Sequence, residues 1–237
     1  LASILRPGLE LEQRALTQMA LGESHEPVSQ HTSAGGVAAL TPFLAALQRH
    51  LPWREARDNP SADWFVNLQV EGSSAVFAAI DSFIQLAAED DGIEILGSAP
   101  RRKVAVGACS YHGPAATSFC AATPLGKDYG PKAEQLSYPI PMRRDMRPDE
   151  TEEEFHDRCF RSFQDFLELH AHELAVMLVE PQWGSARCAQ TWPPELCRRY
   201  IALAQSKGIY VVCDEIMCGL GRHGAAPAPG GTGCFLS

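Results

Sequence analysis

The chain has 237 residues, of which 45% are hydrophobic and 21% are charged. This composition suits one large globular domain, or one domain with a smaller second unit, that buries a real core. The formal net charge of −9, with no basic block, argues against a nucleic-acid surface, and no apolar run reaches the length of a membrane span.

The first 60 residues are predicted to form an N-terminal helical segment, and residues 61–237 a larger domain. In the first segment, Thr41-Pro42 is typical of a helix start, with threonine as N-cap and proline at the first helical position. A short strand is predicted over 64–70. A helix follows over 75–88, because its apolar residues recur at intervals of three and four.

The turn between that strand and that helix contains Gly72 and Ser73. Free backbone N–H groups and a hydroxyl at the positive end of a helix dipole suit a phosphate group. The alternative is that Ser73 or Ser74 simply caps the helix.

A second strand is predicted over 101–109 and is followed by Tyr111 and His112. An aromatic side chain at a strand end can stack on a planar ring, or it can pack under a loop. Residues 126–148 are rich in proline and charge, and we predict a surface excursion there.

A helix is predicted to open at Thr151, followed by acids that favour a capping box. The third strand, 174–179, is entirely apolar. The next helix is predicted to start at 193–195 and to reach Gly208. With the last strand it forms a right-handed crossover between parallel strands.

The last strand, 209–213, runs directly into Asp214. Ligands of open α/β sheets bind beyond the carboxyl ends of strands, where a carboxylate can hold a positive charge. The alternative is an aspartate that caps a turn. Residues 219–224 fit the G-x-G-x-x-G pattern, but they do not join a strand directly to a helix, so we reject a dinucleotide site.

The eight cysteines form no Cys-x-x-Cys pair, and no His-Glu-x-x-His pattern occurs. We therefore expect reduced, mostly structural cysteines in an intracellular protein, either cytoplasmic or organellar, and no metal site. The first residue is Leu1, and the last residues form neither a helix nor a polar tail. We expect a fragment of a longer chain, with no visible targeting signal.

Two motifs together resemble the class III aminotransferases, which are pyridoxal-phosphate enzymes of fold type I. They are Val179-Glu180-Pro181-Gln182-Trp183-Gly184 and, after a helix, Cys213-Asp214-Glu215-Ile216-Met217-Cys218-Gly219-Leu220-Gly221-Arg222-His223-Gly224. The resemblance covers residues 60–237 well and the first 60 weakly. It implies a three-layer α/β/α fold with a mostly parallel sheet, present here as a partial large domain truncated at its C-terminal end.

The resemblance also implies roles for individual residues. Asp214 would be the catalytic residue that pairs with the pyridinium nitrogen. The other cofactor-binding residues would be Gly72 and Ser73 at the phosphate, Tyr111 and Ile216 on the two ring faces, His112 beside Tyr111, and Glu180 near the same sheet edge. Where the family usually has serine before the glycine, this chain has Glu71, an acid close to the expected phosphate.

The implied reaction is pyridoxal-phosphate-dependent transfer of an amino group from an amine or ω-amino acid to a keto acid, in a homodimer without nucleic-acid or membrane partners. The family's Schiff-base lysine would lie some tens of residues beyond Gly224. None of the chain's lysines stands there: Lys103, Lys127, Lys132 and Lys207. We expect this fragment to be inactive alone. The alternatives are an aminomutase of the same family, or a non-catalytic fragment or pseudoenzyme that only binds partners.

Overall fold

A computed structural model of the chain describes residues 69, 71–93, 99–113, 135–184 and 187–219. Several expectations lie outside these residues. They are the helical segment 1–60, its boundary with the larger domain, nearly all of the strand at 64–70, and the end of the glycine-rich turn beyond Gly219.

The strands of the described part form one parallel sheet in the order β2-β1-β3-β4. Their bounds are β1 Lys103–Gly107, β2 Gln135–Tyr138, β3 Leu174–Val179 and β4 Tyr210–Cys213. All six residues of β3 are buried, as its unbroken apolar run predicts for a strand covered on both faces. Val106 of β1 pairs with Leu178, and Val179 pairs with Cys213 of β4.

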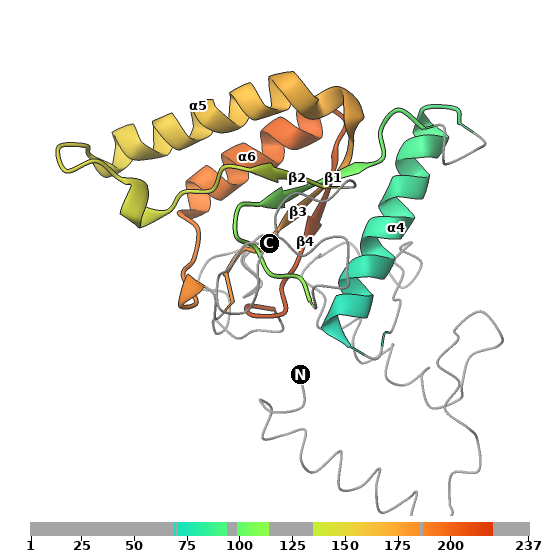
Figure 1. Cartoon of the computed structure of the whole chain (residues 1–237), viewed down its shortest axis with the longest axis horizontal. Helices are drawn as coiled ribbons and strands as arrows, with labels where there is room; N and C mark the ends of the chain where they lie inside the picture. Colours follow the sequence, from blue (N-terminus) through green and yellow to red (C-terminus); the bar gives the residue numbers. More distant parts are fainter. Residues whose placement is uncertain (1–68, 70, 94–98, 114–134, 185–186, 220–237) are drawn as a thin grey trace, which may run out of the picture. The chain divides into compact units, whose positions relative to one another are not determined.

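Helices cover both faces of the sheet. Helix α4, Gly72–Asp90, lies on one face, while α5, Glu152–His170, and α6, Pro194–Ser206, lie on the other (Figure 1). Two short 3₁₀ turns, η3 at Arg143–Asp145 and η4 at Ala171–Glu173, flank α5. The predicted three-layer α/β/α architecture is therefore confirmed.

The helix starts follow from local chemistry. Thr151 accepts a hydrogen bond from the N–H of Glu154, and the Glu154 carboxylate accepts one from the N–H of Thr151, which completes the predicted capping box. Helix α6 begins at Pro194, whose missing N–H costs nothing in the first turn. Gly208 ends the following turn with a positive φ of 73°.

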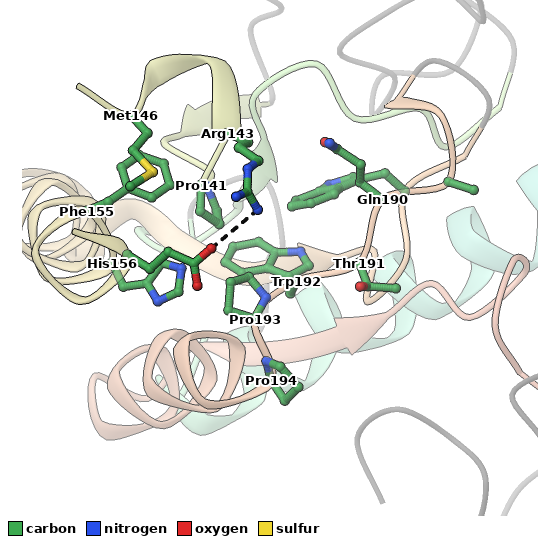
Figure 2. A pocket seen from close by; sticks show the side chains of 13 residues that line it. Pro141, Arg143, Met146, Phe155, His156, Gln190, Thr191, Trp192, Pro193 and Pro194 are labelled. Atoms are coloured by element: carbon green, nitrogen blue, oxygen red, sulfur yellow. Dashed lines mark ion pairs between the residues drawn. The ribbon is translucent and has the colours of Figure 1, made fainter. Parts of the chain in front are cut away.

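A cavity of about 560 Å³ opens between the start of α5 and the chain that leads into α6. Two indole rings, Trp183 and Trp192, stack in its wall with centroids 5.2 Å apart. The Arg143–Glu152 ion pair, 3.3 Å long, also lies among the residues that line this cavity (Figure 2).

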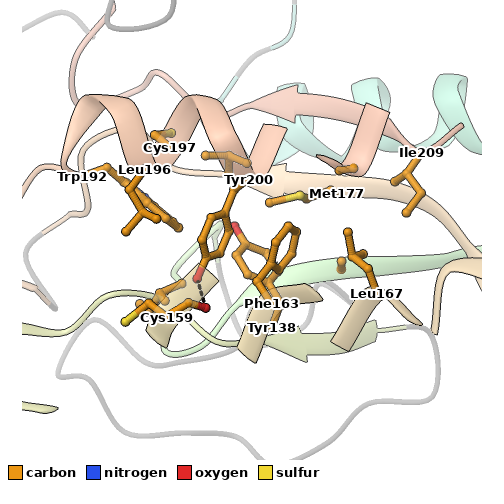
Figure 3. Close-up of a cluster of buried hydrophobic side chains, with 14 of the residues drawn as sticks. Tyr138, Cys159, Phe163, Leu167, Met177, Trp192, Leu196, Cys197, Tyr200 and Ile209 are labelled. Atoms are coloured by element: carbon orange, nitrogen blue, oxygen red, sulfur yellow. Dashed lines mark hydrogen bonds between the residues drawn. The ribbon is translucent and has the colours of Figure 1, made fainter. Parts of the chain in front are cut away.

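The face of the sheet toward α5 and α6 is packed with aromatic rings (Figure 3). Phe163 and Tyr200 stack with centroids 4.0 Å apart, and Tyr138 meets Phe163 edge-on. The Tyr200 hydroxyl donates to the carbonyl of Cys159 at 2.8 Å, and burial raises the pKa of Tyr200 above its usual range. The buried hydroxyl therefore has the partner that its burial requires.

The other face of the sheet packs against α4, and the alternate strand residues that point there differ in composition from those on the first face. Its buried residues are aliphatic: Val76, Ile80, Ala87, Val104, Val106, Ala175, Val176, Leu178 and Val212. No aromatic ring is fully buried in this cluster, although the half-buried Phe83 and Tyr210 pack at its margin.

The predicted surface excursion at 126–148 is wrong for residues 135–138, which form strand β2. Gln135 and Tyr138 are only 7% and 1% exposed, and they pair with Val104 and Gly107 of β1. Its four residues alternate polar and apolar, but so short an alternation does not distinguish a strand from a loop. The Tyr138 hydroxyl reaches the Leu178 carbonyl at 2.9 Å, a tertiary contact that no local pattern reveals.

Candidate functional site

The strand order places a switch point between β1 and β3. From β1 the chain continues to β2 on one side, whereas from β3 it continues to β4 on the other. Connections that diverge in this way leave a crevice beyond the carboxyl ends of the two strands, where open α/β sheets bind their ligands. His112 comes shortly after β1, and Glu180 and Asp214 directly follow β3 and β4.

These three side chains form a buried cluster of ionisable groups. The Nδ1 atom of His112 lies 2.8 Å from Oδ2 of Asp214, and its Nε2 atom lies 3.9 Å from Oε2 of Glu180. The side chains are 0%, 5% and 5% exposed, respectively. The backbone N–H of Tyr111 donates to the same Glu180 oxygen at 3.2 Å. Residues from three strand ends are thus held together away from water.

Backbone hydrogen bonds also fix the position of Asp214 in the cluster. The Asp214 N–H donates to the Val179 carbonyl at 2.7 Å, and Asp214 Oδ1 accepts from the Ile216 N–H at 3.2 Å. Burial raises the pKa of Glu180, and the nearby negative charge of Asp214 raises it further, while His112 opposes both. The Nε2 atom of His112 is buried without a hydrogen-bond partner among the described residues.

The first turn of α4 packs against the same strand ends. A Cβ atom placed on Gly72 would lie 2.5 Å from Cδ1 of Ile216, and one on Gly113 would lie 2.4 Å from Cβ of Ser73. Gly113 also has a φ of 122°, which side-chain-bearing residues rarely adopt. The structure therefore brings Gly72, Ser73 and Ile216 next to the chain that carries His112 and Asp214. Tyr111 is half-buried, and Ile216 is 43% exposed.

The expectation that Ser73 or Ser74 caps α4 is wrong, because the helix begins earlier, at Gly72, with Glu71 as its N-cap residue. Glu71 makes no side-chain hydrogen bond to the helix backbone. Instead, its Oε1 atom accepts from the Ser73 hydroxyl at 2.8 Å and from the Ser74 hydroxyl at 3.3 Å. The hydroxyl expected to face a phosphate is thus turned toward a carboxylate of the same chain.

The described part has no features of a metal centre or a membrane-spanning segment. No group of three or more His, Cys, Asp or Glu residues there is placed to hold a metal ion. None of the described helices is long and apolar enough to cross a membrane. None of the candidate residues named above is among those that line the cavity of Figure 2, so that cavity is separate from the strand-end cluster.

Comparison with known families identifies the chain. The sequence profile of the class III aminotransferases matches residues 42–230, which is most of its length. The chain belongs to the class III aminotransferase family. Among solved structures, an (S)-enantioselective ω-transaminase from Thermomicrobium roseum superposes with a TM-score of 0.67 at 21% identity, over 90% of this chain and 44% of that one.

A PMP-bound aminotransferase from Vibrio fluvialis superposes with a TM-score of 0.62 at 22% identity, over 81% of this chain and 40% of that one. At these identities the likeness supports the fold, which agrees with the fold type I architecture of the family. The chain spans less than half the length of either structure.

The contacts of Arg187 in this aminotransferase-family chain were not predicted from the sequence. Arg187, in the loop between β3 and α6, donates to the Ala108 carbonyl at 3.3 Å and also contacts the sulfur of Met142. It therefore ties the loop after β3 to the chain that leaves β1. A single arginine in an irregular loop carries no periodic or motif signal, and only the tertiary structure reveals its contacts.

Proposed function

We propose that this chain forms the pyridoxal-phosphate site of a transaminase that transfers an amino group from an amine or ω-amino acid to a keto acid. Membership of the class III aminotransferase family supports the reaction class. The observation that carries the proposal is the buried Asp214 carboxylate, held by His112 at the switch point of the sheet.

The strand-end cluster fits the ring end of this cofactor. An ionised carboxylate can accept about four hydrogen bonds, and those from His112 and Ile216 occupy one position on each Asp214 oxygen. Asp214 can therefore accept a further bond from a protonated ring nitrogen. When bound, pyridoxal phosphate supplies an electron-withdrawing ring that stabilises negative charge on the carbon bearing the amino group.

The surrounding residues would position that ring. His112 fixes the orientation of the Asp214 carboxylate through the 2.8 Å contact. Tyr111 and Ile216 would cover the two ring faces, and Glu180 would orient the Tyr111 backbone through its 3.2 Å hydrogen bond. The phosphate end fits less well, because the Glu71 carboxylate already accepts the Ser73 hydroxyl bond.

The two described lysines lie away from this edge. Lys103 begins β1, at the opposite end of the strand from His112, and pairs with Glu173 at 2.7 Å. Lys207 follows α6, before β4 begins. Neither of these described lysines is placed to bond a cofactor at the carboxyl ends of the strands.

Equilibrium binding of pyridoxal phosphate tests the role of Asp214. Asp214→Asn should weaken binding by at least about tenfold, because it replaces a charge-assisted hydrogen bond to the ring nitrogen with a neutral one. Asp165→Asn, the same change on an exposed residue of α5, is the matched control. Equal affinity of both variants for the cofactor would remove Asp214 from the site.

Product analysis distinguishes the candidate reactions. Because we expect this chain alone to be inactive, the test uses a protein that contains this chain and has the length of the matched transaminase structures. Loaded with cofactor, it is incubated with an amine donor, with and without a keto acid. A new amino acid that forms only with the keto acid indicates a transaminase, whereas a rearranged donor without it indicates an aminomutase. Cofactor binding with neither product favours a non-catalytic binding protein.

We also propose that the protein acts as a homodimer, with the segment 126–148 as a candidate contact. The described part of this segment includes β2, at one edge of the four-stranded sheet. Multi-angle light scattering of a protein that contains this chain and has the length of the matched structures should give twice the mass of one subunit, and a fully active monomer would contradict the proposal.

A further inference from the structure

The turn before α4 places a carboxylate where the cofactor phosphate is expected to bind. Glu71 Oε1 lies 2.8 Å from the Ser73 hydroxyl and 3.3 Å from that of Ser74, so both hydroxyls donate to one carboxylate oxygen. A phosphate bound at this helix end could use the Ser73 hydroxyl as a donor only by displacing the Glu71 carboxylate, and it would meet the negative charge of Glu71.

We propose that Glu71 is a specificity-determining residue that disfavours the phosphate group of the ligand at this site. This inference rests on the proposed function, since it concerns the phosphate end of the same cofactor. Glu71 is an internal competitor: its carboxylate occupies the hydroxyl donors and repels a second anion. The phosphate should therefore contribute less to binding here than the ring does.

The packing around the turn makes it difficult for the phosphate to avoid Glu71 by a shift of α4. Gly72 lies against Ile216, and Ser73 lies against Gly113, so closely that a single added Cβ atom would collide in either place. The Glu71 side chain is exposed and makes no cap to the helix backbone. The side chain is thus free to be replaced without loss of a buried contact.

The expected magnitude follows from Coulomb's law. Repulsion between two unit charges about 4 Å apart in water lowers an equilibrium constant by about fivefold, and a phosphate carries about −1.5 to −2 at neutral pH. Glu71→Gln should therefore tighten pyridoxal phosphate binding by about tenfold to thirtyfold at low salt. The gain should shrink as added salt screens the exposed charge.

The experiment measures dissociation constants of pyridoxal phosphate and of pyridoxal, which lacks the phosphate, by fluorescence or calorimetric titration. The proteins are the unchanged chain, Glu71→Gln, Glu71→Ser and the control Glu89→Gln, which removes an exposed carboxylate from the other end of α4. Unfolding curves of all four establish that each is folded.

Tighter binding of pyridoxal phosphate by both Glu71 variants, with pyridoxal binding and the Glu89→Gln control unchanged, supports the inference. Unchanged pyridoxal phosphate binding in Glu71→Gln overturns it while leaving the proposed function intact, because the Asp214→Asn comparison is independent. An equal gain for both ligands also overturns it, since the effect would not involve the phosphate. Failure of every protein to bind either ligand overturns both proposals.

Discussion

Gly113→Ala tests whether α4 and the chain after β1 pack together as described. At its φ of 122°, a side-chain-bearing residue costs about 1–3 kcal/mol of backbone strain. Its new Cβ atom would lie 2.4 Å from Cβ of Ser73, and overpacking of this kind costs about 1–3 kcal/mol more. The free energy of unfolding should fall by about 2–6 kcal/mol, a large part of the stability of a typical domain.

Two other glycines separate these contributions in urea unfolding experiments. Gly92 has a φ of 69° but nothing within 4 Å of an added Cβ, so Gly92→Ala should show about 1–2 kcal/mol of backbone strain alone. Gly184 has no positive φ, and no described residue would lie within 4 Å of an added Cβ atom, so Gly184→Ala should be neutral or stabilising by up to about 1 kcal/mol.

A double variant tests directly whether the added methyl group at Gly113 meets Ser73. Ser73→Gly removes the atom that the new methyl group meets, so the double variant should recover about 1–3 kcal/mol relative to the sum of the single changes. Purely additive effects of the two changes would refute the contact between Ser73 and Gly113, and with it the placement of α4 beside the strand-end cluster.

Three further predictions concern local stability. Thr151→Ala should lower the free energy of unfolding by about 1 kcal/mol, because the N–H of Glu154 loses its cap; thermal unfolding measures this. The hydrogen bonds from Arg158 hold the pKa of Glu150 at about 2, against an ordinary value of 4.5. This contribution is complete above about pH 4.5 and is lost as the pH falls toward 2, so Glu150→Gln should flatten the acid dependence of urea unfolding. Ala189→Gly should stabilise by about 0.5–1 kcal/mol, because exposed Ala189 has a φ of 55°; a lower urea midpoint would contradict the strain.

The elements that the sequence predicts well are those whose signal is local. Strand β3 begins and ends at the predicted residues because its apolar run is unbroken, and α5 begins after Thr151 because the capping box requires only four residues. Strand β2 was missed because its stability comes from pairing with β1 and from the Tyr138 hydroxyl, neither of which is local.

The candidate site shows the same division. Residues that directly follow apolar strands, Glu180 and Asp214, could be assigned to one sheet edge from the chain alone. The hydrogen bonds of Glu71 to Ser73 and Ser74 depend on where α4 begins, and helix ends are poorly fixed by periodicity. The contact of Arg187 with the Ala108 carbonyl depends on the tertiary structure of its loop, so the sequence could not predict it.

The contrast between the two faces of the sheet sets how freely each can change in sequence. On the α5 and α6 face, stacked and edge-on rings such as Phe163 and Tyr200 have preferred mutual orientations, so a substitution disturbs its neighbours. On the α4 face, aliphatic residues such as Val76 and Ile80 can exchange for others of similar volume at less than about 1.5 kcal/mol each. A protein engineer could therefore change the residues on which α4 packs, and with them the position of its first turn relative to a ligand. The aromatic face would continue to stabilise the domain.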